Sequence, residues 1–198
     1  METQEPNALP SEFKNLEQWI ARLDNPEREK KQLPNEVIAK LELQSNDVVA
    51  DIGAGTGYFA LRIAAAYPQV TVIAADSEPE MVAYLQYQAA ERKLDNLEAI
   101  VIDPASPVLP VKANVALTVN TYHHIDTRVE YLKHLLGNMA PGARIAVIDF
   151  NMESPEGPPP EHRIPTAQVV EEFRQAGYAL AEDWRFLPNQ YFLIFKQA

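Results

Sequence analysis

The chain has 198 residues, 46% of them hydrophobic, which is enough for one domain with a single large core and an N-terminal extension. Its 17 basic and 28 acidic residues give a net charge of −11, which argues against nucleic acid as a partner. The absence of cysteine excludes disulfides, thiolate metal sites and thiol nucleophiles. We find no membrane-spanning apolar run and no secretory signal, so we expect a cytoplasmic protein.

Residues 1–34 are predicted to form an N-terminal extension with an amphipathic helix, and residues 35–198 the main domain. Four apolar residues recur at intervals of three and four: Phe13, Leu16, Ile20 and Leu23. This spacing places them on one helix face. The face either packs against the domain or closes over a ligand as a lid, with Trp19 facing the substrate.

The most informative segment is an expected turn between a strand and a helix. The apolar run Val48 to Ile52 predicts a buried parallel strand, and Tyr58 to Tyr67 predicts a helix. Three glycines stand between them at alternate positions: Gly53, Gly55 and Gly57. Because glycine lacks a Cβ and adopts positive φ, such a turn lets a ligand approach the backbone closely.

An acid follows the second expected strand, which covers Val70 to Ala75. This acid, Asp76, comes nineteen residues after Gly57. That distance is close to the spacing of about 20 residues at which a strand-end acid binds ribose hydroxyls in doubly wound folds. The turn and Asp76 therefore predict one site for a nucleoside.

The glycine spacing distinguishes between cofactors. In a dinucleotide fingerprint that begins at Gly53, the third glycine position falls on Tyr58, which is too large. This disfavours a nicotinamide-dependent oxidoreductase. The observed pattern, Asp-x-Gly-x-Gly-x-Gly from Asp51 to Gly57, resembles the first motif of class I S-adenosylmethionine-dependent methyltransferases.

Later segments resemble the same family in the same order, over roughly residues 35 to 196. Val101 to Asp103 resembles its third-strand motif, Ala113 to Asn120 its fourth strand, and Ala140 to Ala143 the turn into its fifth strand. The resemblance implies a Rossmann-like, doubly wound α/β fold with helices on both faces of a seven-stranded sheet. Its last strand would be antiparallel, which the short link at Leu187 to Gln190 also requires.

Local patterns predict where later elements begin and end. Two capping boxes indicate helix starts: Ser77 with Glu80, and Thr127 with Glu130. The segment Asn151 to Pro165 contains five prolines, so we expect no helix there. A helix restarts at Thr166 and ends at Gly177.

The resemblance implies S-adenosylmethionine as cofactor and S-adenosylhomocysteine as product. Asp51 matches the acid near the cofactor's ammonium group and Asp76 the ribose-binding acid, although either could instead cap local backbone. Asp103 would lie beside the adenine, but Asp-Pro also opens ordinary turns. The other expected cofactor contacts are Gly53, Ala54, Gly55, Gly57, Ser77, Met81 and Asn120.

The candidate catalytic residues follow the fourth expected strand. Ligands of open α/β sheets bind beyond the carboxyl ends of the strands, where His123 and His124 would face the acceptor. A histidine could take a proton from a hydroxyl, amine or thiol, or serve only the loop structure. Tyr122 could line the cavity. Asp149, after the fifth strand, is a second candidate base or acceptor anchor, or the partner of a basic residue.

Two further side-chain groups raise specific hypotheses. His123, His124 and Asp126 suggest a metal, but the sequence shows no fourth ligand, so we expect none. Arg163 either binds an acidic acceptor through a bidentate contact or belongs to a rigid surface connection.

These observations predict methyl transfer from S-adenosylmethionine to a small-molecule acceptor. The expected partners therefore include neither nucleic acid nor a membrane, and both monomer and homodimer stay open. The alternative is a non-catalytic protein that binds S-adenosylmethionine as a sensor or scaffold, with the N-terminal helix as a protein interface. The step from cofactor to acceptor rests on analogy.

Overall fold

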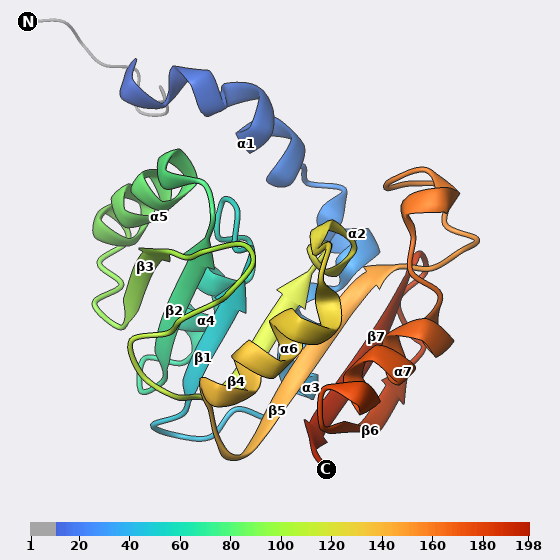
Figure 1. The fold of residues 1–198 in the computed structure, drawn as a ribbon. Coiled ribbons are helices and arrows are strands. Elements are labelled where there is room, and N and C mark those ends of the chain that lie inside the picture. The colour runs from blue at the N-terminus through green and yellow to red at the C-terminus, as the bar shows by residue number, and fades with distance from the viewer. Residues whose placement is uncertain (1–10) are drawn as a thin grey trace, which may run out of the picture.

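A computed structural model describes residues 11–198 and shows a seven-stranded sheet between two layers of helices (Figure 1). The strand order is β3-β2-β1-β4-β5-β7-β6. The strands are β1 (Val48–Ile52), β2 (Thr71–Asp76), β3 (Leu97–Val101), β4 (Ala113–Val119), β5 (Met139–Phe150), β6 (Tyr178–Trp184) and β7 (Gln190–Gln197). β7 is antiparallel to β5 and β6, and the other pairs are parallel. The predicted sheet with an antiparallel last strand is confirmed.

The helices fall into two layers and an N-terminal group. One face of the sheet packs against α3 (Pro34–Lys40), α4 (Ala60–Ala66) and α5 (Pro79–Glu91). The other face packs against α6 (Arg128–Gly137) and α7 (Thr166–Gln175). The N-terminal group consists of the 3-10 helix η1 (Ser11–Leu16), α1 (Glu17–Leu23) and α2 (Arg28–Gln32). In residues 11–198 we find no helix long and apolar enough to cross a bilayer.

The core lies on both faces of the sheet because its central strands are apolar at nearly every position. In β1, Val49 belongs to the cluster under α3, α4 and α5, whereas Ala50 and Ile52 belong to the cluster under α6 and α7. Alternate residues of a strand point to opposite faces, so a continuous apolar run serves both layers. This burial fixes the register of the strands and hence the position of the polar residues at their ends.

The N-terminal group lies above the carboxyl ends of the parallel strands (Figure 1). Phe13 and Leu16 are buried against Met81 and Tyr84 of α5. The predicted apolar face therefore packs against the domain, although its first half is a 3-10 helix. The predicted boundary at residue 34 stays a prediction; α3 begins there and contributes Val37, Ile38 and Leu41 to the core.

The expectations for capping and helix bounds need four corrections. The capping box of Ser77 and Glu80 is wrong, because α5 begins at Pro79 after Glu78 and has no side-chain cap. Thr127 is the residue before α6, but its side chain makes no capping hydrogen bond. The helix expected from Tyr58 begins only at Ala60. A short 3-10 helix, η3 (Pro160–His162), interrupts the proline-rich segment.

Gly57 offers a test of how tightly the turn after β1 is packed. It has φ +83°, and a Cβ there would lie 2.4 Å from Leu85 Cδ2 and 2.9 Å from Leu61 Cγ. We expect Gly57→Ala to lower the free energy of unfolding by about 3 kcal/mol, from overpacking and left-handed strain together. Gly142→Ala is the matched control, since Gly142 has φ +75° with open space around it, and should cost only about 1 kcal/mol. Equal losses in urea denaturation would contradict this packing.

Candidate functional site

The three glycines of the turn have different surroundings. A Cβ on Gly53 would lie 2.4 Å from the Thr121 side chain, and one on Gly57 would clash with Leu85. At Gly55, with φ +55°, the nearest atom to such a Cβ is Leu23 Cδ1 at 3.3 Å. Gly53 and Gly57 are therefore required for packing inside the protein. At Gly55 the side chain near the Cβ position belongs to the N-terminal group, which covers the turn there.

Asp76 joins the end of β2 to the glycine turn. Its Oδ2 accepts a hydrogen bond from the Gly55 amide at 2.7 Å, and its Oδ1 accepts one from the Glu78 amide at 3.0 Å. The side chain is buried, yet each carboxylate oxygen keeps a further lone pair. Asp76 and the glycine turn are thus in direct contact, as their spacing in the sequence predicts.

Asp51 is a buried acid without an ion pair in the part of the chain that the structure describes. Its side chain is 3% exposed, and its Oδ2 accepts a hydrogen bond from the Ala60 amide at 3.1 Å. Burial, and then the charge of Asp76, raise the pKa of Asp51 to about 7. A bound ammonium group would favour the ionised form, so the site suits a cationic ligand.

The end of α1 lies over the turn. Leu23 is the side chain nearest to the Cβ position of Gly55, and Asp24 accepts a 2.6 Å hydrogen bond from the Thr56 hydroxyl. Trp19 is 53% exposed, and its ring lies 5.7 Å from the guanidinium of Arg22. The lid role and a substrate contact by Trp19 stay predictions.

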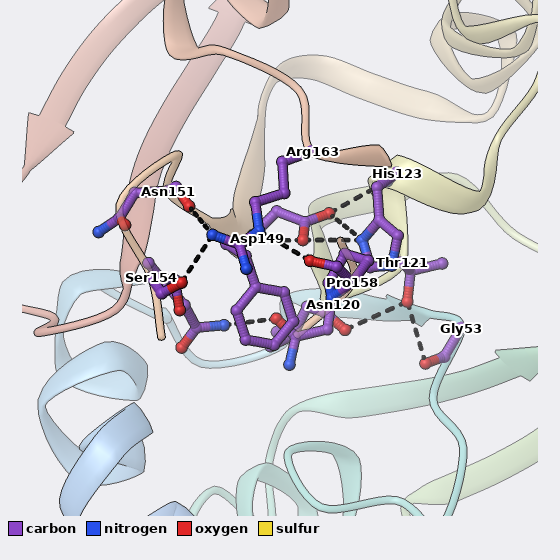
Figure 2. A network of polar contacts seen from close by, with 12 residues as sticks. Gly53, Asn120, Thr121, His123, Asp149, Asn151, Ser154, Pro158 and Arg163 are labelled. Carbon is purple, nitrogen blue, oxygen red and sulfur yellow. Dashed lines mark hydrogen bonds and ion pairs between the residues drawn. The ribbon is translucent and has the colours of Figure 1, made fainter. Parts of the chain in front are cut away.

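The segment after β4 connects the turn to a second polar group. Asn120 has φ 56°, uncommon for a residue other than glycine, and its Oδ1 accepts a hydrogen bond from Gln190. The Thr121 hydroxyl lies 3.5 Å from the Gly53 carbonyl oxygen. Figure 2 shows Thr121 between Gly53 and His123. A cofactor contact by Asn120 stays a prediction.

His123 and Asp149 form a buried pair (Figure 2). His123 Nδ1 lies 2.8 Å and 2.9 Å from the two carboxylate oxygens, and the His123 amide donates to Asp149 Oδ2 at 3.1 Å. Because an ionised carboxylate only accepts hydrogen bonds, Nδ1 is the donor in this pair, which leaves Nε2 as the acceptor nitrogen of the neutral ring. The partner of Asp149 is therefore a histidine, and the pair presents a nitrogen that can accept a proton.

His124 packs beside this pair. The ring centroids of His123 and His124 are 4.0 Å apart. Burial, and then the neighbouring His123, lower the pKa of His124, which favours its neutral form. Its predicted catalytic role stays a prediction.

Tyr122 is buried in the core, and its catalytic or cavity-lining role stays a prediction. Its side chain is 1% exposed and lies in the core beneath α6 and α7. Its hydroxyl donates a 2.6 Å hydrogen bond to Glu172, which Arg128 also holds. The 3-10 helix η2 (Tyr122–His124) thus directs Tyr122 into the core and His123 toward Asp149.

Arg163 does not present its guanidinium to a ligand. It donates hydrogen bonds to backbone carbonyl oxygens of the proline-rich segment, which belong to Asn151, Met152, Ser154, Glu156 and Pro158. The hypothesis of a bidentate contact to an acceptor is therefore wrong. The side chain holds the loop after β5 in one conformation (Figure 2).

The remaining candidates lie around the site without converging on it. Asp103 is exposed and accepts a hydrogen bond from the Ala105 amide at 2.8 Å, which is the turn-opening alternative. Ser77 is exposed, and Met81 packs against η1 and α1. Their contacts to a cofactor stay predictions, as does the backbone contact at Ala54. Among residues 11–198, no three His, Asp or Glu side chains gather as metal ligands.

Two features of the site are not predicted from the sequence. The sequence predicts His123 and Asp149 as separate candidates, and the adjacency of β4 and β5 is the signal that could have joined them. Arg28, which stacks on Tyr58 beside the turn, belongs to a charged run that reads as ordinary surface.

Comparison with known proteins agrees with this geometry. A family model described as "Methyltransferase domain" matches residues 50–145, which include the turn and the segment after β4. Trans-aconitate 2-methyltransferase of Mycobacterium tuberculosis (strain ATCC 25177 / H37Ra) is 32% identical over 123 residues, which cover 61% of this chain and 44% of that protein. The match thus spans less than half the length of this curated relative.

Residues 50–145 thus match a methyltransferase domain, and the strand order is that of the class I S-adenosylmethionine-dependent methyltransferase fold. Among solved structures, a SAM-dependent methyltransferase from Aquifex aeolicus has a TM-score of 0.84 at 22% identity, covering 91% of this chain and 98% of that one. The [4+2]-cyclase SpnF has a TM-score of 0.73 at 15% identity, covering 84% and 80%. These likenesses show the fold that this methyltransferase family uses.

The turn and Asp76 give a direct test of the cofactor site. We expect Gly55→Val and Asp76→Ala each to lower the affinity for S-adenosylhomocysteine at least about 100-fold. The first adds a side chain where the ligand would approach the backbone of the turn, and the second removes the acid beside the turn. Calorimetry measures the affinity, and circular dichroism should show a folded chain. Unchanged affinity in both variants would remove the site from this turn.

Asp51 predicts a pH dependence. Its pKa of about 7 means that its ionised fraction rises between pH 5.5 and pH 8. Because an ammonium group binds the ionised carboxylate, affinity for S-adenosylhomocysteine should rise roughly ten-fold over this range. In Asp51→Asn it should be weaker and nearly independent of pH. An equal pH slope in both proteins would assign the titration to another group.

Proposed function

We propose that the protein transfers a methyl group from S-adenosylmethionine to a small-molecule acceptor and releases S-adenosylhomocysteine. The observation that carries this proposal is the placement of two polar groups on either side of Thr121. The glycine turn with Asp51 and Asp76 lies on one side, and the His123–Asp149 pair lies on the other. A nucleoside site and a proton acceptor therefore meet at neighbouring strand ends.

Residues of the first two strand ends would hold the cofactor. Asp76 would bind the ribose hydroxyls, and Asp51 would bind the ammonium group, which compensates its buried charge. When bound, the cofactor supplies an electrophilic methyl group on a sulfonium. The N-terminal group would exclude water by covering the turn, as Leu23 covers Gly55.

The His123–Asp149 pair would act on the acceptor. Asp149 fixes the tautomer of His123, so that Nε2 can take a proton from a hydroxyl, amine or thiol. The carboxylate then stabilises the imidazolium that forms. A positioned general base of this kind contributes about 100- to 10,000-fold to a rate.

The acceptor class is supported by charge and by the curated relative. The net charge of −11 disfavours nucleic acid, and the relative is named for the small molecule trans-aconitate. The acceptor of this chain would accordingly be a small molecule. A panel of carboxylic acids, phenols, amines and thiols, with release of S-adenosylhomocysteine as readout, tests this proposal.

We expect His123→Gln and Asp149→Asn to lower turnover at least about 100-fold on an acceptor that must lose a proton, with less than about three-fold change in cofactor affinity. His124→Gln should lower turnover less, because His124 lacks the carboxylate partner. Tyr122→Phe is the matched control: it removes a hydroxyl that bonds Glu172 in the core, so turnover per folded molecule should stay at the wild-type level.

Wild-type turnover in both His123→Gln and Asp149→Asn would remove the pair from catalysis. Tight cofactor binding without product release across the whole panel would instead favour a sensor or scaffold.

A further inference from the structure

Arg28 is a partly buried cation beside the glycine turn. Its guanidinium lies 3.9 Å from the centroid of the Tyr58 ring, and Tyr58 directly follows Gly57. Its Nε donates a 2.8 Å hydrogen bond to Gln32, and its Nη1 donates one to the carbonyl oxygen of Leu23. Within residues 11–198, no carboxylate oxygen lies within 4.0 Å of it.

Two other arginines have guanidinium partners that Arg28 lacks. Arg62 lies on the Tyr58 ring as well, at 4.0 Å, but pairs with Glu29. Arg163 is buried, but each of its guanidinium nitrogens donates to backbone carbonyl oxygens. Arg28 has no carboxylate partner, only its Nη1 donates to a backbone carbonyl oxygen, and its Nη2 makes no hydrogen bond within the described residues. Because a partly buried charge with an unused donor gains from a negatively charged partner, this guanidinium suits an anionic ligand.

The charges around Arg28 indicate which part of a ligand would reach it. Burial lowers the pKa of Arg28, whereas the charges of Asp24 and Asp51 partly restore it. Asp51 and Arg28 thus carry opposite charges that lie close enough for each to affect the pKa of the other. The methionine portion of S-adenosylmethionine carries an ammonium group and a carboxylate on one carbon atom. Once Asp51 holds the ammonium group, the carboxylate needs a cation close by.

We propose that Arg28 binds the carboxylate of the cofactor's methionine portion, through a charge-assisted hydrogen bond from the guanidinium. This inference rests on the proposed function, because it assumes the same cofactor at the same turn. It also links the cofactor to the N-terminal group. Arg28 already holds the last residue of α1 through the Leu23 carbonyl, so a bound carboxylate and the end of that helix would share one side chain.

The test compares two ligands that differ in one group. Decarboxylated S-adenosylmethionine keeps the sulfonium, the nucleoside and the ammonium group but lacks the carboxylate. We expect the wild-type protein to bind it about 10- to 100-fold more weakly than S-adenosylmethionine, which is the range for a hydrogen bond between charged groups. In Arg28→Met, affinity for S-adenosylmethionine should fall by this factor, while affinity for the decarboxylated ligand stays within about three-fold. Calorimetry provides the readout without catalysis.

Arg62→Met is the matched control, because it removes a guanidinium from the same ring but one that already has a carboxylate partner. It should keep the wild-type preference for the carboxylate. Arg28→Lys keeps the charge without the planar fork and should retain part of the preference, even if Arg28→Met folds poorly.

The outcomes separate the two proposals. A wild-type protein that binds S-adenosylmethionine and its decarboxylated analogue equally, or an Arg28→Met variant that keeps the preference, would overturn the role of Arg28 alone. A wild-type protein that binds neither ligand would overturn the proposed function and this inference with it.

Discussion

The parallel alignment of β2, β1, β4 and β5 is the constraint on which the site depends. Parallel strands end at the same edge, so side chains far apart in sequence meet there: Asp51, Asp76, His123 and Asp149. β1 lies between β2 and β4, and the helices that follow β1 and β4, α4 and α6, pack on opposite faces of the sheet, which is the point where ligands of open α/β sheets bind. Burial on both faces of these strands keeps their register and so holds the polar groups in place.

The glycine turn combines two requirements that a sequence pattern does not separate. A Cβ on Gly53 would clash with Thr121 and one on Gly57 with Leu85, so these two glycines would be needed even in a protein without a ligand. Gly55 donates its amide to Asp76 and is covered only by Leu23 of α1 among the described residues, and this is where the ligand argument applies. The close packing around the first two glycines also fixes the third, since all belong to one short turn.

Much of the fold could be predicted from the sequence because apolar runs and glycine spacing are local signals. The first two strands and the contact between Asp76 and the turn followed from these signals, whereas the seven-stranded sheet followed from the family resemblance. The pairing of His123 with Asp149 could not, because it depends on which strands are neighbours. The hypothesis that Arg163 binds an acidic acceptor was wrong, because no local sequence pattern shows that its guanidinium donates its hydrogen bonds to carbonyl groups of its own loop. The burial of Tyr122 could not be predicted either, because one turn of 3-10 helix decides which side chain faces the core.

The segments that would choose the acceptor are the loop after β5 and the N-terminal group. Arg163 donates hydrogen bonds to carbonyl oxygens of this loop, and Lys31 of α2 pairs with Glu156 of the loop at 2.5 Å. The N-terminal group therefore touches both the glycine turn and the loop beside Asp149. The [4+2]-cyclase SpnF has the same fold, so the sheet alone does not determine the reaction. Under the proposed function, the acceptor is the molecule that these two segments admit to the His123–Asp149 pair.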